Sequence, residues 1–186
     1  MRSSYMPLLK ALLLLMLTFI IIAFTLFSLY SLFPAPYRET IEKYCKKYDV
    51  DPHLVLSLIK AESNFSPSAA SSAGAGGLMQ ITEDTFSYCI SSMGISPDEA
   101  SILDPDDNIN VGIWYLSTLL KKYSGNTVFA VAAYNAGPSN VDKWLSQGII
   151  SHSEKDDGNI PFEETSRHVT KVDMYRKIYK FLYPGR

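Results

Sequence analysis

One acidic residue, Glu62, stands on the apolar face of a predicted helix, where a carboxyl group can act as a proton donor. It follows Leu58 by four residues and Ile59 by three, and residues at these spacings share one helix face. Burial disfavours the charged carboxylate and raises its pKa toward neutral pH, as a general acid requires. The alternative is a glutamate that only ends the helix and hydrogen-bonds to nearby backbone. Glu62 is therefore the candidate catalytic residue.

A turn rich in small residues follows this helix and can bring backbone close to Glu62. The helix is interrupted at residues 65–67, and the chain resumes at residues 78–80. The glycines between these points permit a tight turn: Gly74, Gly76 and Gly77. Glycine occurs in loops of every kind, so the turn by itself does not indicate catalysis.

The helices that must position these residues follow from the spacing of apolar side chains. Asp51 is a good N-cap and Pro52 a good first helical residue for the helix that carries Glu62. Other helices are expected at 38–48, 84–92, 97–100, 108–123, 127–136, around Val141 and Trp144, and from 164 almost to the end. A turn is expected at 104–107 and an exposed loop at 147–161. No alternating run of strand length is evident, so the predicted fold class is mostly α.

Residues 11–33 carry no charge and are long enough to cross a membrane. At 1.5 Å per residue they form a helix of about 34 Å, against a hydrocarbon core of about 30 Å. A cleaved signal peptide is the alternative, but its apolar region is usually shorter and ends in a small-residue cleavage site. We expect an uncleaved anchor and a stiff Pro34-Ala35-Pro36 spacer, giving two parts: residues 1–36 and a catalytic domain at 37–186.

The distribution of charge bears on orientation and on partners. Arg2 and Lys10 precede the apolar segment, which favours a cytoplasmic N-terminus and a domain on the extracytoplasmic, cell-wall side; Arg38 and Lys43 beyond it weaken this inference. The chain has 17 basic and 19 acidic residues, and the first 36 residues hold two of the basic ones. The remaining 15 basic and 19 acidic residues give the domain a net charge of −4, so nucleic acid is not an expected partner.

The number and spacing of the cysteines and histidines do not predict a metal site. Cys45 and Cys89 are the only cysteines, which excludes a cysteine-only zinc site, and they form either one disulfide or two buried thiols. The three histidines lack the spacing of a metal-binding set: His53, His152 and His168. No metal and no cofactor are expected.

Three motifs occur in order along the chain. They are Glu62-Ser63 with Gly77-Leu78-Met79-Gln80, then Ala133-Tyr134-Asn135-Ala136-Gly137, then Pro161-Phe162-Glu163-Glu164-Thr165. Together they resemble the ES, GLMQ, AYNAG and P-x-x-E-T motifs of the bacterial lytic transglycosylases of the soluble-lytic-transglycosylase type. The resemblance covers roughly residues 39–183 and implies a lysozyme-like fold related to goose-type lysozyme.

The resemblance implies a reaction on peptidoglycan. Glu62 would be the single acid/base acting on the β-1,4 bond between N-acetylmuramic acid and N-acetylglucosamine, leaving 1,6-anhydro ends. Most glycosidases use two carboxylates, and here the acetamido group of the sugar would replace the second. The alternatives are a muramidase of the same fold, with Glu83 or Glu164 as second carboxylate, and a non-catalytic glycan-binding or secretion-assembly module.

The resemblance also implies a set of substrate-binding residues: Ser71, Met79, Gln80, Tyr134, Asn135 and Glu164. Each has a plainer alternative: a turn hydroxyl for Ser71, core packing for Met79 and Tyr134, a surface amide for Gln80, a backbone tie for Asn135, and a helix N-terminal charge for Glu164. The chain departs from the family pattern after Thr165, because Ser166 and His168 stand where the family has arginine and tyrosine. His168 either replaces the tyrosine as a polar aromatic wall or faces solvent.

Overall fold

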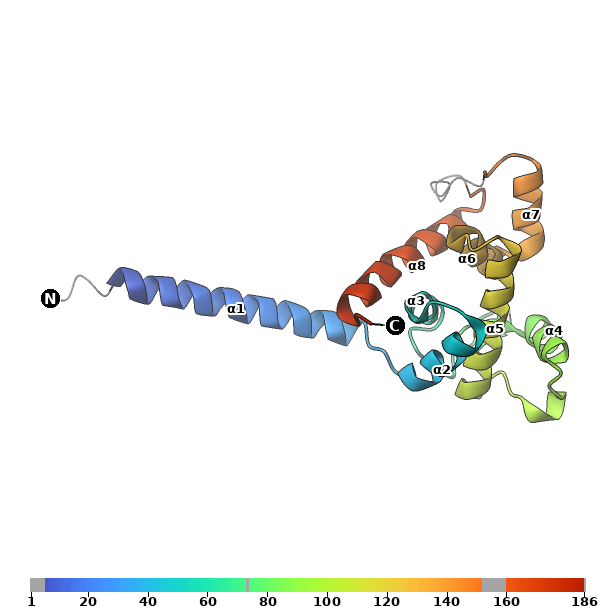
Figure 1. Ribbon diagram of the computed structural model, residues 1–186, viewed down its shortest axis with the longest axis horizontal. Coiled ribbons are helices and arrows are strands. Elements are labelled where there is room, and N and C mark those ends of the chain that lie inside the picture. The colour runs from blue at the N-terminus through green and yellow to red at the C-terminus, as the bar shows by residue number, and fades with distance from the viewer. Residues whose placement is uncertain (1–5, 73, 152–159, 186) are drawn as a thin grey trace. The chain divides into compact units, whose positions relative to one another are not determined.

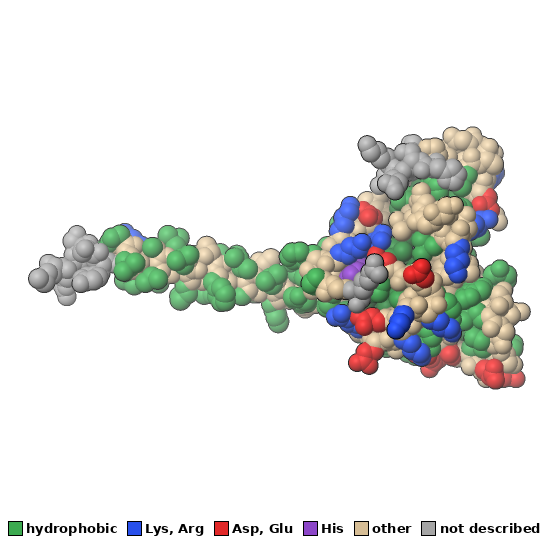
Figure 2. Space-filling view, in the orientation of Figure 1, with side chains coloured by type: hydrophobic (Ala, Val, Ile, Leu, Met, Phe, Trp, Pro, Cys, Tyr) green, Lys and Arg blue, Asp and Glu red, His purple; other side chains and the backbone are tan. Residues whose placement is uncertain are grey.

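The computed structural model describes residues 6–72, 74–151 and 160–185 and divides the chain into two compact units, Met1–Pro34 and Ala35–Arg186. The first unit contains helix α1 (Met6–Leu32), which is strongly apolar and has no buried residues. Figure 2 shows hydrophobic side chains along its visible face. Among the described residues α1 is the one helix whose length and composition suit a membrane span.

The second unit is mostly helical, as the sequence predicts (Figure 1). Its elements in chain order are α2 (Arg38–Tyr48), α3 (Pro52–Glu62), β1 (Ala75–Gly76), β2 (Ile81–Thr82), α4 (Glu83–Met93), the 3-10 helix η1 (Pro97–Glu99), α5 (Pro105–Lys122), α6 (Thr127–Ala136), α7 (Pro138–Ser146) and α8 (Glu163–Leu182). The two short strands pair antiparallel, with Gly76 opposite Ile81, and they close the small-residue turn.

Two helices begin with the same aspartate–proline pair. The side chain of Asp51 accepts a hydrogen bond from the His53 backbone at the start of α3, as predicted. The side chain of Asp104 accepts hydrogen bonds from two backbone N–H groups at the start of α5. The turn predicted at 104–107 is therefore wrong: these residues are the cap and first turn of α5, because an aspartate cap satisfies the free N–H groups there.

Helix α3 lies beside α2 and α8 in the core of this unit, and α6 packs against α5, α7 and α8 (Figure 1). The apolar residues of α3 are almost fully buried: Leu54, Val55, Leu56, Leu58 and Ile59. The inward positions predicted for α8 are confirmed for Val169, Val172, Tyr179 and Leu182, whereas Tyr175 is only half-buried. The contact between α3 and α8 therefore determines what surrounds the end of α3.

Cys45 on α2 and Cys89 on α4 are both buried free thiols, in agreement with the second of the two alternatives. Burial raises the pKa of each thiol to about 12, so both stay protonated at neutral pH.

The loop predicted at 147–161 lies largely outside the described residues, together with His152. At its two described ends Ile150 and Ile160 are buried, so the prediction of an exposed loop is wrong there.

Candidate active site

Glu62 is the last residue of α3, and its side chain is only 15% exposed. Burial raises the pKa of Glu62 from 4.5 to about 7, and the positive charge of Lys171 opposes this rise. A helix C-terminus also carries the negative end of the helix dipole, which disfavours a carboxylate. Near neutral pH both the acid and the carboxylate are therefore populated, as a group that gives and takes a proton requires.

The backbone reverses direction immediately after Glu62. Ser63 caps α3, and its buried hydroxyl donates a hydrogen bond of 2.7 Å to the carbonyl oxygen of Leu78. Asn64 and Phe65 follow with positive φ angles of 52° and 63°, a left-handed conformation that is uncommon for residues other than glycine. The turn at residues 77–80 is thereby joined directly to the end of α3.

Asn108 holds this turn from the other side. It is fully buried on α5; its Oδ1 accepts a 2.8 Å hydrogen bond from the Met79 N–H, and its Nδ2 donates to the carbonyls of Gly76 and Ile102 at 3.1 and 2.8 Å. Gly77 has φ +75°, and a Cβ there would lie 2.3 Å from Nδ2 of Asn108. The sequence analysis missed Asn108; its signal is an amide beside the apolar stripe of a helix.

Met79 and Gln80 lie in the turn but differ in what they offer a ligand. Met79 is fully buried, and a Cβ added to Gly112 would lie 2.4 Å from its sulfur atom. The structure therefore places Met79 in the core, not on an accessible wall, because Gly112 leaves room for its side chain. The Gln80 amide donates to the carbonyls of Ala69 and Gly77 at 3.0 and 2.9 Å, so its Oε1 is the amide atom left for a ligand.

Tyr134 links helix α6 to the same turn. Its hydroxyl donates a hydrogen bond of 2.8 Å to the carbonyl oxygen of Met79, and its ring centroid lies 5.4 Å from that of Tyr115. Burial raises the pKa of Tyr134 well above 10, and the nearby charge of Glu62 raises it further. Tyr134 thus has a neutral hydroxyl group close to Glu62, and the proton of this group is used in the hydrogen bond to the Met79 carbonyl.

Asn135, the next residue, is bound to α8. Its side-chain oxygen accepts a hydrogen bond of 2.7 Å from the hydroxyl of Thr165, which is 2% exposed. The partner is a side chain on another helix, so the plainer alternative of a backbone tie is wrong, and contact of Asn135 with substrate stays a prediction. Three side-chain hydrogen bonds, made by Ser63, Tyr134 and Thr165, now connect all three sequence motifs.

Ser71 and Glu164 are the two predicted site residues that these contacts do not include. Ser71 is exposed, and its hydroxyl accepts a hydrogen bond of 3.0 Å from the backbone of Ala75, which closes the turn. Glu164 is exposed on the first turn of α8. Both therefore have the local roles that the plainer alternatives describe, and contact with substrate stays a prediction.

His168 does not face solvent. Its side chain is 11% exposed, and its Nε2 lies 3.3 Å from Oε1 of Glu62. Burial lowers the pKa of His168 from 6.5 to about 4, and the charge of Lys171 lowers it further, so the imidazole is neutral near pH 7. Lys171 itself donates a hydrogen bond of 3.0 Å to the carbonyl oxygen of Ala61.

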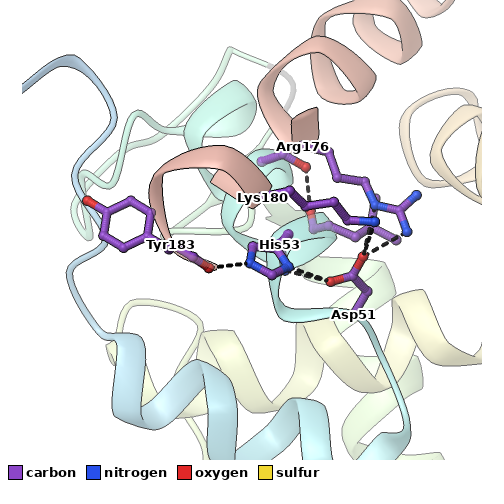
Figure 3. Close-up of polar contacts among 7 residues, drawn as sticks. Asp51, His53, Arg176, Lys180 and Tyr183 are labelled. Atoms are coloured by element: carbon purple, nitrogen blue, oxygen red, sulfur yellow. Dashed lines mark hydrogen bonds and ion pairs between the residues drawn. The ribbon is translucent and has the colours of Figure 1, made fainter. Parts of the chain in front are cut away.

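The other end of α3 is also attached to α8, as Figure 3 shows. Oδ2 of Asp51 accepts hydrogen bonds of 2.9 and 2.7 Å from Arg176 and lies 3.5 Å from Nζ of Lys180. The ring of His53 lies between Asp51 and the carbonyl oxygen of Tyr183, at 3.1 and 2.8 Å. These contacts fix the register of α8 along α3 and hence the position of His168.

No cluster of three or more His, Cys, Asp or Glu side chains suited to a metal ion is found in residues 6–72, 74–151 and 160–185.

Comparison with known proteins identifies a family and close relatives. Residues 39–155 match the family model described as the transglycosylase SLT domain. The soluble lytic murein transglycosylase of Salmonella typhimurium is 35% identical over 153 residues, which cover 80% of this chain and 23% of that protein. The membrane-bound lytic murein transglycosylase C of Yersinia pestis is 29% identical over 166 residues, which cover 77% of this chain and 46% of that protein.

A solved structure shares the fold. The lytic transglycosylase Slt of Pseudomonas aeruginosa, in an inactive variant with glutamine in place of a glutamate, matches with a TM-score of 0.73 and 33% identity over 80% of this chain and 24% of that one. This similarity confirms the predicted lysozyme-like, mostly α fold. The chain spans about a quarter of the soluble relative and less than half of the membrane-bound one.

Proposed function

The chain belongs to the transglycosylase SLT domain family, and from that premise we propose that it is a lytic transglycosylase that cleaves peptidoglycan glycan strands. One observation carries the proposal above all. The end of α3 holds a buried carboxyl group with a pKa of about 7, and hydrogen bonds tie the GLMQ and AYNAG segments to one another and to that helix end. The names of the relatives supply the substrate class.

In the proposed reaction Glu62 is the single acid/base. As the acid it gives its proton to the glycosidic oxygen while the bond from that oxygen to C1 of the muramoyl residue breaks. The carboxylate then takes the proton of the muramoyl C6 hydroxyl, and that oxygen bonds to C1. The products are a 1,6-anhydromuramoyl end and a free N-acetylglucosamine end, Glu62 is again protonated, and no water is consumed.

The surroundings of Glu62 favour this reaction over hydrolysis by two carboxylates. Among the described residues the charge that acts on its ionisation is that of Lys171, which is positive. Glu83 and Glu164, the carboxylates that a muramidase would need, are both exposed. The acetamido group of the sugar then takes the place of the second carboxylate.

We further propose that α1 anchors the protein in the cell membrane with the catalytic domain on the cell-wall side. Its length and hydropathy support an anchor, and one relative is named as membrane-bound. Arg2 and Lys10 before the apolar segment favour a cytoplasmic N-terminus.

The test is mass spectrometry of the fragments that the full chain, in detergent, releases from purified peptidoglycan sacculi. Anhydro ends are lighter than hydrolysed ends by one water, so the products separate a transglycosylase from a muramidase. Glu62→Gln should lower the rate at least about 100-fold, because an amide cannot act as the acid or the base. The exposed Glu83→Gln is the matched control and should keep wild-type activity.

Three outcomes would contradict the proposal. Hydrolysed ends would identify a muramidase, and undiminished cleavage by Glu62→Gln would exclude the assigned residue. A wild-type chain that binds sacculi but releases nothing would be a non-catalytic glycan-binding module.

A further inference from the structure

The Nε2 atom of His168 is the buried side-chain polar atom in the described residues that has no hydrogen-bond partner. A buried polar group without a hydrogen-bond partner destabilises a fold, so its retention calls for an explanation. The atom lies 3.3 Å from Oε1 of Glu62, close enough for a hydrogen bond after a small adjustment. Hydrogen bonds of catalytic groups are often long without substrate and shorten in the complex.

The other groups around Glu62 are already engaged. The hydroxyl of Tyr134 on α6 donates to the carbonyl of Met79, and the ammonium group of Lys171 on α8 donates to the carbonyl of Ala61. Lys60 on α3 itself donates to the side chain of Asn64. His168 is therefore the ring positioned to bind Oε1 of Glu62.

The imidazole is neutral when it meets this carboxyl group. Burial and the positive charge of Lys171 both disfavour the imidazolium, and burial disfavours the carboxylate. A neutral imidazole carries a proton on one nitrogen only, so Nε2 either donates to Glu62 or accepts from it. If Nε2 accepted, the acidic proton of Glu62 would point toward His168, away from a glycosidic oxygen.

We propose that His168 is a positioning residue that donates a hydrogen bond from Nε2–H to Oε1 of Glu62 and leaves Oε2–H free to protonate the substrate. This inference rests on the proposed function. The bond strengthens when Glu62 gives up its proton, because a hydrogen bond to a carboxylate is stronger than one to a neutral acid. It therefore stabilises the ionised acid formed as the glycosidic bond breaks, and His168 neither gains nor loses a proton.

Replacing His168 with residues of similar bulk separates this role from packing. His168→Phe removes the donor but retains an aromatic ring, and should lower kcat on sacculi by roughly 10- to 100-fold because the acid is no longer held in position. His168→Tyr supplies a hydroxyl donor and should retain most of the activity. Arg167→Gln, an exposed neighbour on α8, is the control and should behave as wild type.

The direction of the pH effect is the decisive measurement. The rate should fall at alkaline pH as Glu62 loses its proton. In His168→Phe this alkaline limb should move up by about one pH unit, because the ionised form has lost its hydrogen-bond donor. An unchanged limb would mean that His168 only packs, and a downward move would mean that Nε2 accepts the bond; either result overturns the proposal.

A second readout does not need activity. Infrared difference spectra of the full chain minus Glu62→Gln report the protonated carboxyl group of Glu62, and its titration should move upward in His168→Phe and stay near wild type in His168→Tyr. If His168→Phe does not fold, His168→Met replaces it as the variant without a donor. Absence of cleavage by the wild type would defeat the proposed function, whereas an unmoved infrared titration would defeat this inference.

Discussion

The ammonium group of Lys171 lies 3.0 Å from the carbonyl oxygen of Ala61, the residue before Glu62, and donates a hydrogen bond to it. This contact satisfies a free carbonyl at the end of α3 and places a positive charge near both Glu62 and His168. The charge restrains the rise in the pKa of Glu62 and adds to the fall in the pKa of His168. The same lysine therefore favours the ionised carboxylate of Glu62 and the neutral imidazole of His168.

The raised pKa of Glu62 should be visible in stability. The carboxyl group of Glu62 has a pKa near 4.5 in the unfolded chain and about 7 in the folded chain. Its contribution to the stability of the fold is therefore fully present below about pH 4.5 and is lost as the pH rises through about 7. Glu62→Gln should therefore be more stable than wild type by up to about 3 kcal/mol at pH 8, with little difference at pH 4.5. Thermal denaturation of the full chain in detergent at the two pH values measures this, and an equal effect at both would contradict it.

Asn108 should be essential to the turn that carries Gln80. Asn108→Ala leaves one buried N–H and two carbonyl groups without their partner, and should cost about 3 kcal/mol and most of the activity. Asn110→Ala, on the same helix, removes one hydrogen bond from the Tyr48 hydroxyl and should cost about 1 kcal/mol. Denaturation curves and rates on sacculi compare the two, and equal losses would show that the turn does not depend on Asn108.

Gly77 should tolerate no side chain. A Cβ at Gly77 would lie 2.3 Å from Asn108 and 2.6 Å from the carbonyl oxygen of Ile102. Gly94 has a similar φ, +71°, with nothing within 4 Å of a Cβ, so Gly94→Ala reports the backbone cost alone, about 1 kcal/mol. We expect Gly77→Ala to cost at least about 2 kcal/mol more than this control in denaturation experiments. Similar costs would mean that the turn adjusts freely.

Asp51 should make the fold sensitive to acid. Burial opposes its ionisation, but hydrogen bonds from Arg176 and the His53 backbone outweigh this and lower its pKa below 3.8. Its stabilising effect is present above the unfolded pKa and is lost as the pH falls through the folded one. Asp51→Asn should thus lower the free energy of unfolding by roughly 1–3 kcal/mol at pH 7. In denaturation experiments at acid pH, the difference in stability between this variant and wild type should disappear.

The control for that prediction is Asp173→Asn, which removes an exposed pair with Lys177 on α8 and should cost less than about 1 kcal/mol. A gap between Asp51→Asn and wild type that stayed constant as the pH fell would mean that the charge of Asp51 does not stabilise the fold.

Local sequence signals were sufficient for the helix that carries the acid. The cap at Asp51, the proline after it and the apolar spacing up to Glu62 are all short-range features. Helix α3 begins at Pro52 as predicted and ends at Glu62, before the interruption predicted at residues 65–67. The same aspartate–proline signal at Asp104 begins α5, where the sequence analysis predicts a turn. An aspartate followed by proline suits both a turn and a helix start, so this local signal alone does not separate the two.

Contacts between distant segments could not be predicted in the same way. The sequence around Met79 does not indicate that Gly112, on another helix, leaves room for the sulfur atom of Met79. Nor does any local pattern indicate that His168 meets Glu62, because that pairing depends on how α8 is registered along α3. Such pairings depend on tertiary packing, which the periodicity of a single helix does not contain.

Helix α8 holds both ends of α3: Arg176 and Lys180 bind Asp51 at the first turn, and Lys171 binds Ala61 at the last. The region that matches the family model stops at residue 155, before α8 begins at Glu163. A fragment excised at that limit would retain Glu62 yet expose it to water and return it to an ordinary surface acid. A piece of this chain that keeps both ends of α3 attached therefore includes α8 and Tyr183, whose carbonyl oxygen contacts His53.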